Sequence, residues 1–294
     1  MNRSLKDIMQ TELPFGGKIL FLAGDLRQCL PVIPGGNRGQ VVDSCIVRSH
    51  LWPSFKVLNL NINMRVAAGN NLELQDFDRW QVSIGDGVDI GASDKVQLPA
   101  PRVFSIKKNT RASPNAEGKC MIDFCKLIYP DLANNINDPE FLQHRAILAP
   151  TNVEVDTINS VLLSLMPEEV LKVYSSDNFE CLNHNHHLYS IDYLNRLKPS
   201  GYPEHILTLK KGMPLMLLRN LCPKEGLCNG TKLIFIENLR NKLLKCRIST
   251  SGKDVLIPRI KFLPTDKHCP VEWSRIQFPV RVCFATTINK SQGN

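Results

Sequence analysis

The sequence has 294 residues, 43% of them hydrophobic and 22% charged, which is ordinary for a globular protein large enough for two domains. No stretch approaches the roughly 18 uninterrupted apolar residues of a membrane span, and Met1 leads into a polar run instead of a signal-peptide pattern, so we expect a soluble, unsecreted protein with no membrane partner. The net charge of +8 is compatible with an acidic partner but does not identify one.

The first sixty residues alternate helical and strand-like patterns. Residues 1–12 have the pattern of an amphipathic helix. The continuous apolar run KILFLAG at 18–24 favours a strand buried on both faces, in a parallel sheet covered by helices. Apolar residues at helical spacing follow at 40–52, and KVLNL at 56–60 is a second predicted strand. Strand, helix and strand in this order predict an α/β domain.

A second strand and helix follow a polar, glycine-bearing stretch that ends near residue 101. Residues 119–130 have a helical pattern, and RAILAPTN at 145–152 has that of a buried strand. Thr151 and Glu154 then form a T-x-x-E capping box. The apolar residues that continue one face of the helix behind it are Val155, Ile158, Val161, Leu162 and Leu165.

The cysteines predict reduced thiols. Ten cysteines include no CxxC pair, and several lie inside apolar runs, so we expect a nuclear or cytosolic protein without a disulfide framework. Cys181 with His184, His186 and His187 could imitate a metal site, but no second ligand pair stands at a usual spacing. We favour a polar surface loop there and assign no metal ligand.

The region after residue 190 combines β-like patterning with most of the positive charge. Short apolar runs are separated by turn residues, as in a small β-barrel or sandwich. Residues 191–261 contain fourteen Lys and Arg against five Asp and Glu, an excess of nine where the whole chain has +8. Such a regional excess is expected of an element that faces a polyanion. A merely solvated basic face is the alternative.

Three polar hooks follow predicted strands, where ligands bind in open α/β sheets. They are GDLRQ at residues 24–28, NINMR at 61–65 and TTINKSQG at 286–293. Together they supply carboxamides, arginines, a lysine and hydroxyls, the groups that bind polyphosphates or a nucleic-acid backbone. Taken singly, the hooks have ordinary alternatives: a plain turn, a surface arginine and the start of a helix, respectively.

The order and wording of five motifs resemble the petite-integration-frequency (PIF) family of ATP-dependent DNA helicases, especially the copies carried by Helitron-type transposons. The motifs are LAGDLRQCLPVIPGG, LNLNINMR, LKKGMPLMLLRNLCPKEGLCNGTKLI, IPRI and FPVRVCFATTINKSQG, and they span essentially the whole chain. The resemblance implies an α/β fold of RecA-like, parallel-sheet helicase domains with a small β-rich, SH3-like insertion. It also implies ATP and Mg²⁺ as cofactors, single-stranded DNA and a DNA fork or duplex as partners, and 5′ to 3′ movement within superfamily 1B. The implied location is nuclear, with a mitochondrial one also open for the parent family.

The same resemblance implies four segments. Residues 1–62 correspond to the C-terminal part of the first RecA-like domain, called 1A in this family, and residues 63–190 to the first part of the second, called 2A. Residues 191–265 correspond to the basic insertion called 2B. Residues 266–294 correspond to the return to 2A.

The resemblance also implies roles for individual residues. Gln28 would sense the γ-phosphate of ATP from a motif III hook that Gly24 and Asp25 shape. Arg65 resembles the motif IV arginine that reaches the same phosphate as an arginine finger, a role suited to a planar, permanently charged group. Gln28 and Arg65 are therefore the implied catalytic residues.

Motif V is implied to supply the remaining contacts. In TINKSQG, some residues would lie along the DNA backbone and others in the nucleotide cleft. The implied DNA-binding residues are Thr287, Asn289, Lys290 and Ser291. The implied nucleotide-binding residues are Gln292 and Gly293, which join Gly24, Asp25, Gln28 and Arg65.

The sequence contains neither a Gly-rich loop with Lys-Ser/Thr nor a Walker B acidic pair, which P-loop NTPases use to hold phosphates and Mg²⁺. In the family both lie upstream of the first residues here, and motif VI lies beyond Asn294. We therefore expect a fragment that is catalytically incompetent alone, with ATP and Mg²⁺ bound through missing parts of the parent protein. The alternatives are a non-catalytic single-stranded nucleic-acid-binding module and a transposon remnant; the oligomeric state is unknown.

Overall fold

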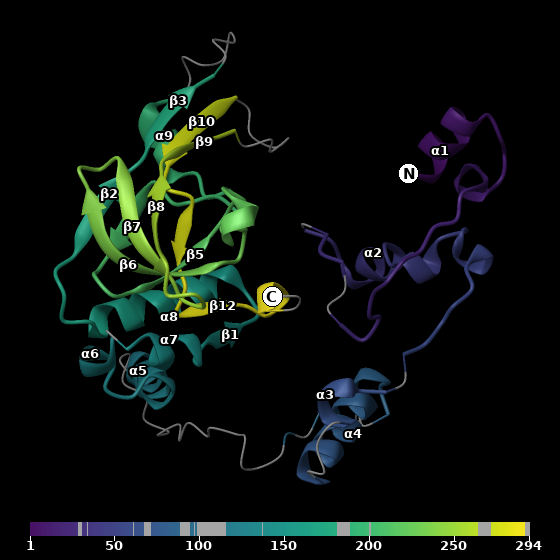
Figure 1. The fold of residues 1–294 in the computed structure, drawn as a ribbon, viewed down its shortest axis with the longest axis horizontal. Helices are drawn as coiled ribbons and strands as arrows, with labels where there is room; N and C mark the ends of the chain where they lie inside the picture. The colour runs from purple at the N-terminus through teal and green to yellow at the C-terminus, as the bar shows by residue number, and fades with distance from the viewer. Residues whose placement is uncertain are drawn as a thin grey trace. The chain divides into compact units, whose positions relative to one another are not determined.

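The computed structural model forms two compact units, residues 1–103 and 104–294 (Figure 1). It describes residues 1–28, 31–33, 35–60, 62–67, 72–88, 95–96, 98, 116–136, 138–180, 189–199, 201–263 and 272–291. Within these ranges, no helix combines the length and apolar character needed to cross a membrane. The segment boundaries predicted after residues 62, 190 and 265 stay predictions.

The first unit is built from short helices and extended chain. The predicted helix at its start is confirmed as α1, Asn2–Met9, which contacts the 3-10 turn η1, Pro14–Gly17. The helical spacing predicted for residues 40–52 gives only one turn and a half of α-helix before 3-10 turns take over. The further elements of this unit are α2 (Arg38–Asp43), η2 (Ile46–Arg48), η3 (Trp52–Ser54), α3 (Met64–Ala67) and α4 (Leu72–Gly85).

The two strands predicted at residues 18–24 and 56–60 are wrong. Both segments lie outside any strand, and their side chains are largely exposed: Ile19 is 101%, Phe21 82% and Leu60 100% exposed. A strand forms only when a neighbouring strand takes up its N–H and C=O groups. No described segment pairs with either run, so the predicted βαβ unit is absent from the described part of this unit.

The second unit begins with the helices and the strand predicted around residues 119–165. The helical pattern at 119–130 is confirmed as α5 and the strand as β1. The strand is buried at Ile147 and Ala149 but not at Leu148, which is 49% exposed. The capping box is also confirmed, because Thr151 Oγ1 accepts from the Glu154 N–H at 3.3 Å and Glu154 Oε2 accepts from the Thr151 N–H at 3.1 Å. The elements are α5 (Ala116–Ile128), α6 (Leu132–Asn135), α7 (Pro139–Gln143), β1 (Ile147–Ala149) and α8 (Asn152–Leu165).

A small parallel sheet joins this early segment to the end of the chain. β1 pairs in parallel with β12, Ala285–Thr287, so that Leu148 lies opposite Thr286. Each of the two strands leads into a helix, β1 into α8 and β12 into α10, Ile288–Ser291. Parallel strands followed by helices place two helix starts at one edge of the sheet, where ligands of α/β proteins bind.

The β-rich block predicted after residue 190 is confirmed as a five-stranded antiparallel sheet. A turn with Arg240 and Asn241 at its centre, both at positive φ, joins the third and fourth strands of the sheet, as is typical of hairpins that match the sheet twist. Its inward side chains belong to the same hydrophobic core as those of α5 and α8. In sheet order the strands are β11 (Val280–Val282), β5 (Pro214–Leu217), β6 (Lys232–Leu239), β7 (Leu243–Ile248) and β8 (Asp254–Pro258).

The remaining strands form two smaller antiparallel sheets. In Figure 1 the group with β3, β9, β10 and α9 lies at the end of the second unit opposite α5 to α7. One sheet pairs β2 (Leu171–Tyr174) with β4 (Ile206–Leu209). The other has the order β3 (Ser176–Phe179), β10 (Trp273–Gln277) and β9 (Ile260–Phe262). Two short helices complete the unit, α9 (Ile191–Arg196) and the 3-10 turn η6 (Pro223–Glu225).

A fully buried arginine, Arg275, joins β10 to β3 and α9. Arg275 on β10 donates to both carboxylate oxygens of Asp177, through Nε to Oδ1 at 3.0 Å and through Nη2 to Oδ2 at 2.7 Å. The same guanidinium donates to the carbonyls of Leu194, Leu197 and Pro203 at 2.9, 3.1 and 3.0 Å. Two of these carbonyls lie at the C-terminal end of α9, where a positive charge also complements the helix dipole.

Candidate nucleotide and nucleic-acid sites

The hook at residues 24–28 is a tight turn that Asp25 closes. The Asp25 side chain accepts from the Arg27 N–H at 2.9 Å and from the Gln28 side-chain amide at 3.3 Å, and its carbonyl accepts from the Gln28 N–H. Gly24, Asp25 and Gln28 are all exposed. A short polar side chain that accepts a hydrogen bond from the backbone N–H two residues later commonly forms a turn. The local geometry therefore agrees with the plain-turn alternative. The phosphate-sensing role of Gln28 stays a prediction.

Helix α4 contacts the first hook. Arg27 Nε donates to Asp86 Oδ1 at 2.6 Å just past the end of α4, and this bond raises the pKa of the Arg27 guanidinium. The Arg27 stem passes so close to Gly85 that a Cβ there would meet its Cδ at 2.8 Å. A side chain at position 85 would therefore displace Arg27.

The second hook leads into α3, which contains Arg65. Just before α3, Asn63 Nδ2 donates to Asp78 Oδ1 on α4 at 2.7 Å, so α4 contacts both hooks of the first unit. The Arg65 side chain lies outside what the structure describes, and its arginine-finger role stays a prediction.

The third hook becomes the end of β12 and the short helix α10. Thr287 and Lys290 are partly buried, whereas Asn289 and Ser291 are exposed. The Ser291 hydroxyl donates to the Ile288 carbonyl at 2.7 Å. The predicted nucleotide-binding residues Gln292 and Gly293 lie outside the described residues. The predicted DNA contacts thus share one short edge of the second unit.

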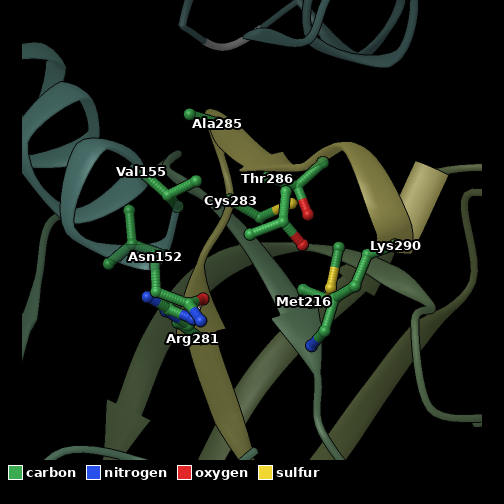
Figure 2. A pocket seen from close by; sticks show the side chains of 10 residues that line it. Asn152, Val155, Met216, Arg281, Cys283, Ala285, Thr286 and Lys290 are labelled. Atoms are coloured by element: carbon green, nitrogen blue, oxygen red, sulfur yellow. Dashed lines mark hydrogen bonds between the residues drawn. The ribbon is translucent and has the colours of Figure 1, made fainter. Parts of the chain in front are cut away.

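A small pocket lies at this edge between α8, β5, β11 and β12. Figure 2 shows Thr286 and Lys290 on one side and Asn152 and Arg281 on another, with Met216 nearby. Arg281 donates through Nη1 to Asn152 Oδ1 at 3.0 Å. Its other amine donates to Asp156 Oδ1, so the arginine is anchored to the first turns of α8.

The pocket brings positive charges together. Burial, together with the nearby Arg281 and Arg219, lowers the pKa of Lys290. In sheet register, Arg281 on β11 lies opposite Met216 on β5, which lies opposite Lys232 on β6. Residues opposite one another share a face of the sheet, so a positive row, defined here as Arg281 and Lys232 with Lys290 beside it, runs from α10 onto the β-rich block. Asp156 balances part of the Arg281 charge, so Lys232 and Lys290 supply most of the net charge of the row. An excess of positive charge of this kind attracts a polyanion.

The acidic residues of the β-rich block are largely neutralised by its own bases. Arg247 pairs with Asp254 at 2.8 Å, and Lys253 pairs with Glu225 at 3.1 Å. Within the described ranges, other bases of this block take part in no salt bridge, so their charge faces solvent or a partner. They are Arg196, Lys211, Lys224, Lys232, Arg240 and Lys242. Lys210, Arg219 and Arg259 also form no salt bridge, but they donate to backbone carbonyls.

The donor set of the described residues does not fit a metal ion. Across these residues no group of three His, Cys, Asp or Glu side chains could hold one. The cluster of Cys181 with His184, His186 and His187 lies outside the described residues. No Mg²⁺ ligand is therefore assigned among the residues that the structure describes.

The polar face of α8 was not predicted from the sequence. Asn152, Asp156 and Asn159 stand at i, i+4 and i+7, one side of a helix, and all three bond to residues 281–285. Asn159 is buried on the same helix as the apolar residues that the pattern identified. An amide at a core-facing position of an otherwise apolar stripe is the signal that could have found it.

Comparison with known proteins gives two matches in sequence. Residues 1–95 match the PIF1-like helicase family, and residues 192–238 match the 2B domain of the DNA helicase Pif1. The first match includes the hooks at 24–28 and 61–65, and the second covers β4, β5 and most of β6. No curated protein matches at a significant level.

Solved structures match nearly all of the chain. A crystal structure of Pif1 helicase from Candida albicans has 23% identity and a TM-score of 0.62, and the match covers 100% of this chain and 60% of that one. Bacteroides Pif1 bound to ssDNA has 17% identity and a TM-score of 0.57, over 99% and 57%. A structure of two coordinating Pif1 helicases at forked dsDNA has 18% and 0.58, over 100% and 56%. The chain therefore spans less than two thirds of these relatives, and the likeness shows the fold, a RecA-like helicase fold of mixed α/β type.

Proposed function

The chain resembles the PIF1-like helicases in two segments of its sequence and shares the fold of Pif1 helicases, and on this premise we propose that it is part of an ATP-dependent DNA helicase. In this proposal the second unit holds single-stranded DNA, while the first unit carries residues that respond to the nucleotide. The motor belongs to superfamily 1B and moves 5′ to 3′.

One observation carries the proposal. The positive row of Arg281, Lys232 and Lys290 begins at the segment that resembles motif V and continues onto the β-rich block that matches the 2B domain. A strand of DNA has a phosphate at every nucleotide, so a line of positive side chains matches its repeat better than one isolated site would. Thr287, Asn289 and Ser291 supply hydroxyl and amide groups beside the row, the partners that phosphate oxygens accept from.

The nucleotide-responsive part of the proposal rests on the first unit. Gln28 stands at an exposed turn that Asp25 organises, as a group that approaches a γ-phosphate must. Arg65 would reach that phosphate as the arginine finger, where its charge stabilises the oxygens during transfer. ATP and Mg²⁺ are bound through a Gly-rich loop and an acidic pair that the 294 residues do not contain.

The test of DNA binding uses charge-removing variants at matched positions. The titration measures fluorescence anisotropy of a labelled oligothymidylate at several salt concentrations. Lys290→Ala and Lys232→Ala each lower the affinity and reduce the slope of log K against log salt by about 0.7, the value for one phosphate contact on a single strand. The control is Lys172→Ala, an exposed lysine on β2, which lies far from the C-terminal end of the second unit in Figure 1. Equal effects of all three substitutions would refute the positive row as the DNA site.

Nucleotide dependence separates the helicase from a non-catalytic module that binds single-stranded nucleic acid. The parent helicase, with its Gly-rich loop present, changes its DNA affinity when a non-hydrolysable ATP analogue binds, and Gln28→Ala weakens that change. A module binds DNA equally with and without the analogue. We also propose a nuclear location for the parent protein and an origin in a Helitron-type transposon, which imaging of the tagged parent protein and the flanking genomic DNA respectively test.

A further inference from the structure

A buried amide holds the chain just before the third hook. Asn159, on the third turn of α8, is 5% exposed. Its Oδ1 accepts from the Ala285 N–H at 2.8 Å, and its Nδ2 donates to the Val282 carbonyl at 3.2 Å. One side chain therefore satisfies backbone groups on both sides of Cys283 and Phe284. We call these bonds the Asn159 clamp.

A second side chain holds the same segment from another helix. The Tyr129 hydroxyl, at the end of α5, donates to the Phe284 carbonyl at 2.9 Å. The Phe284 side chain is fully buried and meets the Tyr129 ring edge-on at 5.6 Å between centroids. The backbone at residues 282–285 is thus fixed by α8 through Asn159 and by α5 through Tyr129.

The clamp stands where β12 begins. β12 has three residues and pairs with β1 at three positions only, so the short ladder by itself constrains its register weakly. Lys290 follows five residues after Ala285, separated from it only by the rest of β12 and the first turn of α10. A shift of the chain at Ala285 therefore moves Lys290.

We propose that Asn159 is a positioning residue for the DNA-contacting segment Thr287–Ser291. The inference rests on the proposed function, because it assigns the clamp to the placement of Lys290 on a phosphate. Val155, Ile158 and Leu162 of the same helix are buried and apolar, and a buried amide at this face costs free energy unless its bonds are made. Its bonds go to Ala285, the first residue of the strand that leads into this segment, and to Val282 at the end of β11, so they set where β12 begins.

The experiment measures coupling between the clamp and the lysine. Dissociation constants for oligothymidylate are determined for the 294-residue chain and for Asn159→Ala, Lys290→Ala and the double variant. Asn159→Ala weakens binding about tenfold, within the coupling range of residues in one hydrogen-bond network. In the Lys290→Ala background the same substitution has an effect well under tenfold, because the one charged group that it places is gone and only the polar side chains of the segment remain.

Two further variants separate positioning from stability. Leu162→Ala removes a fully buried side chain of α8 and destabilises the core, and its dissociation constant stays near that of the unaltered chain. Tyr129→Phe keeps the ring and removes only the hydroxyl, which lies 2.9 Å from the Phe284 carbonyl and 3.2 Å from that of Arg145. This variant shows the same coupling to Lys290→Ala in smaller degree. Relative to the other amides of the β1–β12 ladder, hydrogen exchange at the Ala285 amide accelerates in Asn159→Ala and not in Leu162→Ala, where all core amides accelerate together.

The outcomes distinguish the two proposals. Additive effects of Asn159→Ala and Lys290→Ala, or an equal loss of affinity in Leu162→Ala, overturn the positioning role while leaving DNA binding in place. If the unaltered chain does not bind the oligonucleotide, or if Lys290→Ala binds as tightly as the unaltered chain, the proposed function fails and the positioning role fails with it.

Discussion

Replacing Arg275 tests how much its buried hydrogen bonds and ion pair stabilise the second unit. Arg275→Ala leaves the buried Asp177 carboxylate without its guanidinium partner, so that the Ser175 hydroxyl is its remaining hydrogen-bond donor among the described residues. Three carbonyl oxygens also lose the donor that now lies 2.9–3.1 Å away. Removing one member of a buried ion pair costs about 3–5 kcal/mol. For a unit of this size that corresponds to a fall in Tm of about 6–20 °C.

The magnitude can be divided between the ion pair and the carbonyls. In Arg275→Met combined with Asp177→Leu neither charge remains, and such replacements of a buried pair are often close to neutral. Here the carbonyls of Leu194, Leu197 and Pro203 still lack a donor, at a cost of about 1–3 kcal/mol for each that water cannot reach. The double variant therefore recovers only part of the stability that Arg275→Ala loses.

Trp273 provides a local probe for this experiment. The Arg275 guanidinium lies 5.0 Å from the centre of the buried Trp273 ring, so urea unfolding followed by fluorescence in a Trp52→Phe, Trp80→Phe background reports on this network. Arg247→Ala is the matched control, because Arg247 and Asp254 form an exposed pair at 2.8 Å, worth about 0–1 kcal/mol. If Arg275→Ala costs no more than Arg247→Ala, the network does not hold this group of strands together, and the reasoning is refuted.

Three other predictions concern activity, pH and thiol chemistry. The 294-residue chain hydrolyses ATP with single-stranded DNA no faster than background in a steady-state assay; robust turnover that Arg65→Ala abolishes would contradict this. Burial and neighbouring arginines lower the pKa of Lys290, so its positive charge is lost as pH rises through that pKa, before an ordinary lysine titrates. The affinity advantage of the unaltered chain over Lys290→Ala should therefore fade early in a pH series, whereas Lys290→Arg keeps the advantage. Identical pH profiles for the unaltered chain and Lys290→Arg would argue against a depressed pKa. Burial raises the pKa of Cys246 to about 12 and also raises the pKa values of Cys125 and Cys283. Iodoacetamide at pH 8 therefore labels the partly exposed Cys120 but none of these three cysteines in the folded chain. Mass spectrometry that shows Cys246 labelled as fast as Cys120 would contradict the burial of Cys246.

The candidate site was only partly accessible from the sequence. The third hook was predicted, and the structure places its Lys290 beside Arg281 and in line with Lys232. The first hook was also predicted, and its polar tip is a turn that Asp25 closes. How the first unit and the DNA-contacting edge act together stays a prediction, as do the roles of Gln28 and Arg65.

The sequence by itself determined the elements whose causes are local. The period of the apolar residues and the capping box specify α8, and turn residues between short alternating runs specify β5 to β8, because a helix start or a hairpin turn is decided within a few neighbouring residues. The resemblance of five sequence motifs to the PIF helicases indicated the fold, which the solved structures support.

Only the tertiary structure decided which segments find partners. The apolar runs at 18–24 and 56–60 have strand-like sequences, yet no described strand pairs with them, since pairing depends on a second segment that a local pattern cannot supply. The Asn159 clamp joins residues more than 120 positions apart, and Arg275 meets Asp177 across 98. Hydrogen bonds between residues so far apart in the sequence form only when the whole unit folds. A polar residue in an apolar helix face shows that it needs a hydrogen-bond partner, but the sequence does not show where that partner lies.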